Sequence, residues 1–302
     1  MSSTEEIKTF QTLFKYQHSF ITFKVISTAC ELGIFDLLRE SGELLSSGTL
    51  AEHLKTSPIG LQRLLEACVG LKLLTLEWKD GKDFYGNTDF TNLYLVKSSP
   101  KSQYYSMKFY SEVMYPSMQH LPEVVRKGKN QSSSIYGTPN VFEIIYRSKE
   151  ELQTSSSFLN ELWPVLGREV LSAFDLSQFP LICDVGGNTG GLAKELISLY
   201  PKCIVTIFDL SKLAETFKNH CLPSEDSQIT FHAGGGVLIV EMLLDEDKRG
   251  PSTAHFYSLL MLVLTEGKER SATEFNVLLR KAGFQKIELK KGSLFHIILG
   301  RK

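Results

Sequence analysis

The apolar positions of residues 7–39 recur mostly at helical spacing, and Gly33 interrupts them. This pattern predicts two helices with a break at the glycine. The first helix is apolar on more than one side, because it carries phenylalanine at Phe10, Phe14, Phe20 and Phe23. Such a helix either lies inside a core or buries a face against a second chain. We interpret it as a dimerisation element.

Residues 47–96 predict two short helices followed by a β-hairpin. The helices span Gly48 to Leu54 and Pro58 to Leu71, and the hairpin turns at Asp80-Gly81. Helix, helix and hairpin are the parts of a winged helix, which suggests DNA binding as one alternative. The second helix offers few long polar side chains for reading bases, so packing or dimerisation is favoured. We therefore assign residues 1–100 to a helical, winged-helix dimerisation domain.

An apolar run at Leu181–Val185 breaks into glycines and then continues as an amphipathic helix. This order predicts a strand, a tight loop and a helix N-terminus, where the backbone of Gly186, Gly187 and Gly190 lets a ligand approach closely. The loop reads Asp184-x-Gly-x-Asn-x-Gly, which is not the G-x-G-x-x-G spacing of dinucleotide sites. It fits S-adenosyl-L-methionine (SAM) better.

A second strand, β-branched and ending in a carboxylate, runs from Ile204 to Asp209. An acid at such a position, about twenty residues after the last glycine, can accept both hydroxyls of a ribose. The alternative is that Asp184 and Asp209 only cap turns at the ends of strands. Because the two acids occur together at this spacing, we favour cofactor binding.

Aromatic and methionine side chains recur between residues 104 and 126, a pattern typical of a core and also of a cofactor lid. A polar stretch at 127–139 then marks the approach to a second domain, which we assign to residues 101–302. Tyr146 and Trp163 are amphipathic aromatics that can stack on a nucleoside, although each is also typical of a core.

The composition of the chain limits the classes of partner that it is expected to bind. The net charge is -1 and the pI is near 6.7, so no basic field attracts nucleic acid. The five cysteines form no C-x-x-C pair, which argues against disulfides or a zinc site and fits a reduced cytoplasm. The apolar runs are too short to span a bilayer, and we expect no export signal. A small-molecule partner is therefore expected, with no metal.

The order of these features resembles a known family. It comprises the winged helix, Tyr146-Arg147-Ser148, Trp163, Phe174 to Pro180, and Asp184-x-Gly-Gly followed by Ala193-Lys194-Glu195. The chain resembles the small-molecule, SAM-dependent O-methyltransferases nearly end to end, and within them the branch that methylates the hydroxyl of N-acetylserotonin in melatonin formation. The resemblance implies a homodimer with an N-terminal dimerisation domain and a Rossmann-like α/β domain for SAM.

Position by position, the resemblance implies that Tyr146, Trp163 and Asp209 contact SAM and that the Gly186–Gly190 loop lies under its methionine part. It also implies that Glu241 and Glu269 are the acids that support the family's general base. The helix that faces the indole substrate has Leu260 and Leu264 where the family usually has Asn and Gln. The indole amide would lose hydrogen-bond partners there.

The chain departs from the family after Ala233. Gln228 to Ala233 runs directly into Gly234-Gly235-Gly236, so the fourth-strand region, with the histidine that serves as general base, is absent. The predicted domain is therefore incomplete, with an internal truncation near 233/234, and its catalytic residue is unknown. His255 is the one histidine in the helix after Glu241 and is a weak candidate for a replacement base.

Two functions remain open at this point. One is a methyltransferase with impaired or absent activity, since a hydroxyl without a base is a weak nucleophile. The other is a non-catalytic partner that pairs with a full-length subunit and regulates it.

Three glycines are too few for a parallel crossover, so Gln228–Phe231 and Val237–Val240 are not expected to occupy their family positions together. We expect a hairpin or a displaced strand, and exposed apolar surface at the centre of the sheet.

Overall fold

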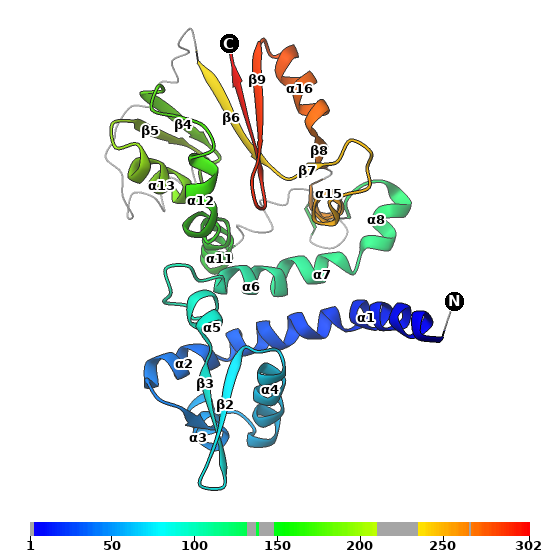
Figure 1. The fold of residues 1–302 in the computed structure, drawn as a ribbon, viewed down its shortest axis with the longest axis vertical. Coiled ribbons are helices and arrows are strands. Elements are labelled where there is room, and N and C mark those ends of the chain that lie inside the picture. The colour runs from blue at the N-terminus through cyan, green and yellow to red at the C-terminus, as the bar shows by residue number, and fades with distance from the viewer. Residues whose placement is uncertain (1–2, 132–136, 139–147, 210–234, 266) are drawn as a thin grey trace. The chain divides into compact units, whose positions relative to one another are not determined.

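The computed structural model describes residues 3–131, 137–138, 148–209, 235–265 and 267–302. The chain divides into two compact units, Met1–Glu112 and Val113–Lys302. Figure 1 shows the elements of both in chain order. Among the described helices, none combines the length and apolar character that a membrane span needs.

The first unit begins with two helices, α1 (Ser3–Glu31) and α2 (Ile34–Ser41). Gly33 separates them with a left-handed φ of 76°, at the predicted break. The unit then continues with helices, a hairpin and two further helices: β1 (Leu45–Ser46), α3 (Ser47–Leu54), α4 (Pro58–Gly70), β2 (Leu74–Lys79), β3 (Lys82–Asn87), α5 (Asp89–Tyr94) and α6 (Tyr104–Phe109).

Local signals place these elements where the sequence predicts them. The Ser57 hydroxyl accepts from the Gly60 N–H, which caps α4, and Pro58 fills its first turn. Asp80 and Gly81 both take positive φ in the hairpin turn, as a two-residue connection requires. The three strands pair antiparallel in the order β1-β3-β2, over a core that includes the fully buried Phe35, Leu65 and Tyr85.

The second unit carries a π-helical turn at its boundary and then alternates helices and strands. Its elements are η1 (Tyr110–Met114), α7 (Tyr115–Met118), α8 (Leu121–Lys127), α11 (Lys149–Asn160), α12 (Trp163–Leu171), β4 (Leu181–Val185), α13 (Gly191–Leu199), β5 (Ile204–Phe208), β6 (Gly236–Glu241), β7 (Leu243–Leu244), α15 (Ser252–Leu264), β8 (Arg270–Ser271), α16 (Ala272–Lys281), β9 (Lys286–Lys291) and β10 (His296–Arg301).

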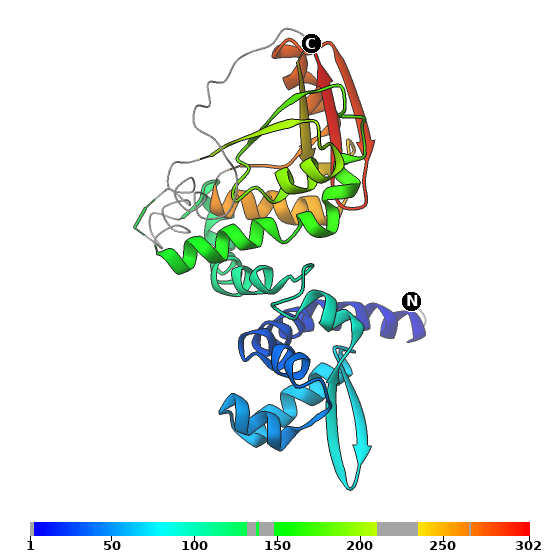
Figure 2. The same cartoon turned by 90° about the vertical axis from the view of Figure 1, so that its left-hand side faces the viewer.

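The described strands of this unit form separate sheets. β4 and β5 are parallel, as an α/β domain with α13 between them requires. β6, β10 and β9 form an antiparallel sheet with β10 in the middle, and β7 pairs with β8 in parallel. One core joins the two larger sheets, because Leu171 of α12 and Leu196 of α13 pack with partly buried residues of β4, β5 and β6. Figure 2 shows these strands and helices from the side.

The strand pair β4–β5 has one covered and one exposed face. Ile182 and Val205 pack against the helices α12 and α13. Val185 and Ile204, which alternate with them, are 75% and 64% exposed. The expected third strand, Gln228–Phe231, lies outside the described residues, and so does the turn from it through Gly234. Val237–Val240 is in β6, where it pairs with β10 and with none of the other described strands.

Candidate functional site

The loop between β4 and α13 is built so that only glycine fits at several positions. Gly186 and Gly190 have left-handed φ of 73° and 76°, and Asn188 between them has φ of 50°. A Cβ on Gly187 would lie 2.7 Å from Cγ of Asp184 and 2.9 Å from Cγ2 of Ile207. The loop thus packs closely against both strand ends, and its glycines carry no side chain that would keep a ligand away from the backbone.

Two buried oxygens beside this loop have no hydrogen-bond partner in the described part of the chain. They are Oδ2 of Asp184 and Oδ1 of Asn188. The amide nitrogen of Asn188 is occupied, since it donates to the Ser156 carbonyl at 2.8 Å. An unpartnered buried acceptor is costly, about 1–3 kcal/mol, so these two oxygens are places where a polar ligand can donate hydrogen bonds.

Burial raises the pKa of the Asp184 carboxyl above its usual range, and the negative charge of Asp209 adds to the shift. The two acids that the sequence predicts as a pair therefore lie close enough to interact. A ligand that donates hydrogen bonds to them relieves the same unfavourable interaction that raises this pKa.

Asp209 also has a structural task. Its Oδ2 accepts from the backbone N–H of Asn188 at 2.7 Å and so ties the end of β5 to the glycine loop. The expectation that this acid caps a turn and the expectation that it binds a ligand are thus compatible, because a carboxylate has about four sites that accept hydrogen bonds.

Trp163 lies at the far end of the same loop. A Cβ on Gly191 would lie 2.7 Å from Cδ1 of Trp163 and 2.6 Å from Oδ1 of Asn160. Asn160 accepts from the Gly191 N–H at 3.3 Å. Sequence reasoning missed Asn160 and Ser156, although the buried polar run of α11 at Thr154, Ser155 and Ser156 is an unusual feature that points to them. Tyr146 lies outside the described residues.

The two predicted supporting acids are brought together from separate elements. Glu241 is the last residue of β6, and Glu269 directly precedes β8. Burial raises the pKa of both carboxyls, the charge of Glu269 raises that of Glu241 further, and Arg270 opposes both shifts. The Glu269 N–H donates to Oγ of Ser258 on α15 at 3.3 Å, which holds the loop against that helix.

The predicted substrate-facing side chains are buried. Leu260 and Leu264 of α15 are each 7% exposed, and α15 packs against α7, α8 and β7. His255 lies in the first turn of the same helix and is half-buried. Within the described residues, no three His, Cys, Asp or Glu side chains gather as a metal site would require.

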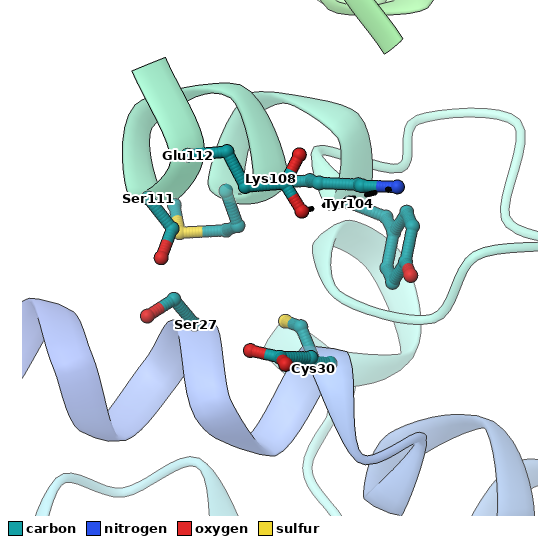
Figure 3. A pocket seen from close by; sticks show the side chains of 8 residues that line it. Ser27, Cys30, Tyr104, Lys108, Ser111 and Glu112 are labelled. Atoms are coloured by element: carbon teal, nitrogen blue, oxygen red, sulfur yellow. Dashed lines mark ion pairs between the residues drawn. The ribbon is translucent and has the colours of Figure 1, made fainter. Parts of the chain in front are cut away.

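A separate cavity of about 240 Å³ lies in the first unit, between α1 and α6. Figure 3 shows its lining, which includes Ser27, Cys30, Tyr104 and the ion pair of Lys108 with Glu112 at 3.9 Å. It contains none of the predicted site residues.

Comparison with known proteins shows which family models and which relatives match the chain. A model of the "O-methyltransferase domain" matches residues 118–235 and 230–285, and a model of the "O-methyltransferase dimerisation domain" matches residues 14–97. Acetylserotonin O-methyltransferase of Gallus gallus is 42% identical over 346 positions, and that of Homo sapiens is 39% identical, each with full coverage of both chains.

Among solved structures, human N-acetylserotonin methyltransferase in complex with SAM matches with a TM-score of 0.93 at 39% identity, covering 100% of this chain and 99% of that one. PigF with SAH matches with a TM-score of 0.81 at 22% identity, covering 97% and 99% of the two chains, which is a likeness of fold.

Proposed function

Since the chain belongs to the family of SAM-dependent O-methyltransferases and carries their dimerisation domain, we propose that it binds SAM at the β4–α13 loop and that its methyl acceptor is the hydroxyl of N-acetylserotonin. The observation that carries the proposal is the pair of unpartnered buried oxygens on Asp184 and Asn188 beside a loop that only glycine can form. A SAM molecule carries hydrogen-bond donors that these oxygens can accept from. Its methyl group is activated because it is bonded to a sulfonium.

The residues around the loop fit this cofactor. Asp209 at the end of β5, which accepts from the Asn188 N–H, would also accept from the ribose hydroxyls. The backbone of Gly186, Gly187 and Gly190 would lie under the methionine part. Trp163 would border the nucleoside, and Tyr146 would join it as the family resemblance implies. These residue types fit SAM, because the cofactor needs polar acceptors for its hydroxyls and flat apolar surface for its base.

We further propose that methyl transfer by this chain is strongly impaired. The alignment to the Gallus gallus relative spans 346 positions against 302 residues here, a difference of 44. The family model also matches in two pieces that meet near residue 233. Both support an internal truncation there that removes the family's base-bearing segment. Glu241 and Glu269 remain, but their raised pKa values come from burial and mutual repulsion, and neither replaces an imidazole.

A homodimer fits the exposed surface of α1. Phe10, Phe14 and Phe20 are 60%, 50% and 49% exposed, and Ile7, Leu13 and Ile21 are also exposed apolar side chains on this helix. A single chain does not bury such a helix, and a second copy would. The proposed dimerisation domain, residues 1–100, is untouched by the truncation. We propose a cytoplasmic location, with which the four described free cysteines are consistent.

The same surface favours a second candidate function. A chain with a complete dimerisation domain and an incomplete catalytic domain can pair with a full-length subunit and lower its activity without turnover of its own. This role would require the N-terminal domain, and it would not require a general base.

Three measurements test these proposals. Calorimetry with SAM tests the site, and absence of binding would end the cofactor assignment. Turnover of N-acetylserotonin by the pure protein is expected to lie about 100- to 10,000-fold below that of a complete relative, the contribution of a positioned base. Turnover near that of the relative would contradict impairment. Mixing the chain with the complete relative then separates the candidates, because a regulatory partner lowers the relative's rate and an independent enzyme does not.

A further inference from the structure

Helix α13, which follows the glycine loop, does not cap its own N-terminus. Its N-cap residue is Gly190, which has a left-handed φ of 76° and no side chain that could accept a hydrogen bond. Other helices of the chain carry this acceptor themselves, as Ser271 does for α16. The first N–H groups of a helix have no partner inside the helix, so an acceptor for them must come from elsewhere. The positive φ that favours glycine at 190 therefore leaves the capping of α13 to another element.

Asn160, the last residue of α11, supplies that acceptor. Its Oδ1 accepts from the Gly191 N–H at 3.3 Å. The packing around this contact is tight, because a Cβ on Gly191 would lie 2.6 Å from the same oxygen and 2.7 Å from Cδ1 of Trp163. The end of α11 and the start of α12 thus lie directly against the first residue of α13.

A second contact joins α11 to the middle of the loop. Asn188 has a left-handed φ of 50°, and its side chain is only 5% exposed. Its Nδ2 donates to the Ser156 carbonyl at 2.8 Å. Ser156 precedes Asn160 by one helical turn, so both contacts come from the same face of α11.

β5 holds the same loop through two further hydrogen bonds. The Phe208 carbonyl accepts from the Gly186 N–H at 2.7 Å, and the Asp209 carboxylate accepts from the Asn188 N–H at 2.7 Å. The loop is therefore anchored to two elements, the strand β5 and the helix α11. Its conformation depends on both of them, because its glycines alone permit many backbone conformations.

We propose that Asn160 is a positioning residue for the cofactor, because its bond to the Gly191 N–H holds the Gly186–Gly190 loop in the conformation that binds SAM. This role rests on the proposed SAM binding at the loop. The bond between Asn188 and the Ser156 carbonyl is the second tie of the loop to α11. A loop that is already ordered loses less conformational freedom when the ligand binds, so these ties increase the affinity without touching the ligand.

The first test measures the affinity for SAM by calorimetry in two variants of Asn160. Asn160→Leu keeps a side chain of similar size without the acceptor and should weaken binding about 5- to 10-fold, the effect of one hydrogen bond. Asn160→Asp keeps an acceptor for the Gly191 N–H and should stay within about threefold of wild type. Wild-type affinity in Asn160→Leu would overturn the proposal, and so would an Asn160→Asp protein as weak as Asn160→Leu.

The control is Asn276 of α16, which is half-buried like Asn160 and accepts from Nε of Arg280 at 3.0 Å. Asn276→Leu should leave the affinity for SAM unchanged. It removes a hydrogen bond of a helical asparagine that makes no contact with the loop, so it reports any effect of such a loss on the fold alone.

The second test uses hydrogen exchange in the unliganded protein and separates positioning from general destabilisation. Asn160→Leu should speed the exchange of the Gly190 and Gly191 amides about fivefold and leave the amides of β10 unchanged. Equal acceleration in the loop and in β10 would show a general loss of stability and overturn the proposal. Absence of SAM binding to the wild-type chain would instead end the cofactor proposal, and the exchange comparison would still show whether Asn160 holds the loop.

Discussion

At the scale of single residues, Asp209 combines a structural and a proposed ligand-binding role, and two substitutions separate them. Asp209→Asn keeps an oxygen that accepts from the Asn188 N–H, whereas Asp209→Ala removes it. We expect Asn to weaken SAM binding about 10- to 100-fold through the lost charge-assisted hydrogen bonds, and Ala to weaken it more because the loop is also released. Calorimetry measures both. The exposed acid Asp175, whose carboxylate accepts from the Ser177 N–H, provides the control Asp175→Ala. Equal SAM affinity of wild type and Asp209→Asn would refute the ribose assignment.

The raised pKa of Glu241 predicts in which direction the stability of the fold changes with pH. Its carboxyl pKa is raised in the folded chain, first by burial and then by Glu269. The folded state therefore holds this proton more tightly than the unfolded state does, and the associated stability is present at low pH and lost as pH rises through the raised pKa. Glu241→Gln should increase the melting temperature at alkaline pH and change it little below about pH 3, where the carboxyl is protonated in both states.

Glu246 provides a control, because its carboxyl pKa is shifted in the opposite direction. Hydrogen bonds from Thr273 and Ser271 hold its pKa below the usual range. Its contribution is present above the ordinary carboxyl pKa and lost on acidification, so Glu246→Gln should lower the melting temperature at neutral pH. A Glu241→Gln protein that is less stable than wild type at alkaline pH would show that the acid is held in its charged form.

At the scale of elements, the β4–α13 loop depends on the absence of a side chain at Gly187. An alanine there would place Cβ 2.7 Å from the Asp184 carboxylate, closer than such contacts allow, so the loop or the acid must move. We expect Gly187→Ala to abolish SAM binding in calorimetry while circular dichroism shows retained helix. Gly70→Ala, at the end of α4 with no atom near its would-be Cβ, should leave binding unchanged. Normal SAM affinity in Gly187→Ala would show that this loop is not the cofactor site.

At the scale of the whole molecule, the first unit has a complete core of its own, and α1 presents exposed phenylalanines. We expect a fragment of residues 1–112, which keeps Tyr104 and Met107 of α6 packed on this core, to fold and to sediment as a dimer. In the full chain, Phe10→Glu together with Phe14→Glu should yield monomers, since both side chains are at least half exposed and a charge there disrupts an apolar interface more than it disrupts the fold. Lys8→Glu on the same helix is the control. A fragment that sediments as a monomer would contradict the dimer assignment.

The amino-acid sequence by itself determined the features that depend on neighbouring residues. The helix break at Gly33, the Pro58 start of α4, the Asp80-Gly81 turn and the order of β4, glycine loop and α13 all follow from local backbone preferences, and all are present. The resemblance that led to the family also depended on short stretches of sequence, and the comparisons confirm it.

Only the tertiary structure decided which distant groups meet. That Asn160 and Ser156 of α11 contact the glycine loop and that Asp209 binds Asn188 depend on packing. Sequence reasoning considered the loop together with the strands on either side of it, and it passed over Asn160. The physical reason is that Asn160 lies 31 residues before Gly191 in the chain, and no local pattern reports which helix packs against the start of α13.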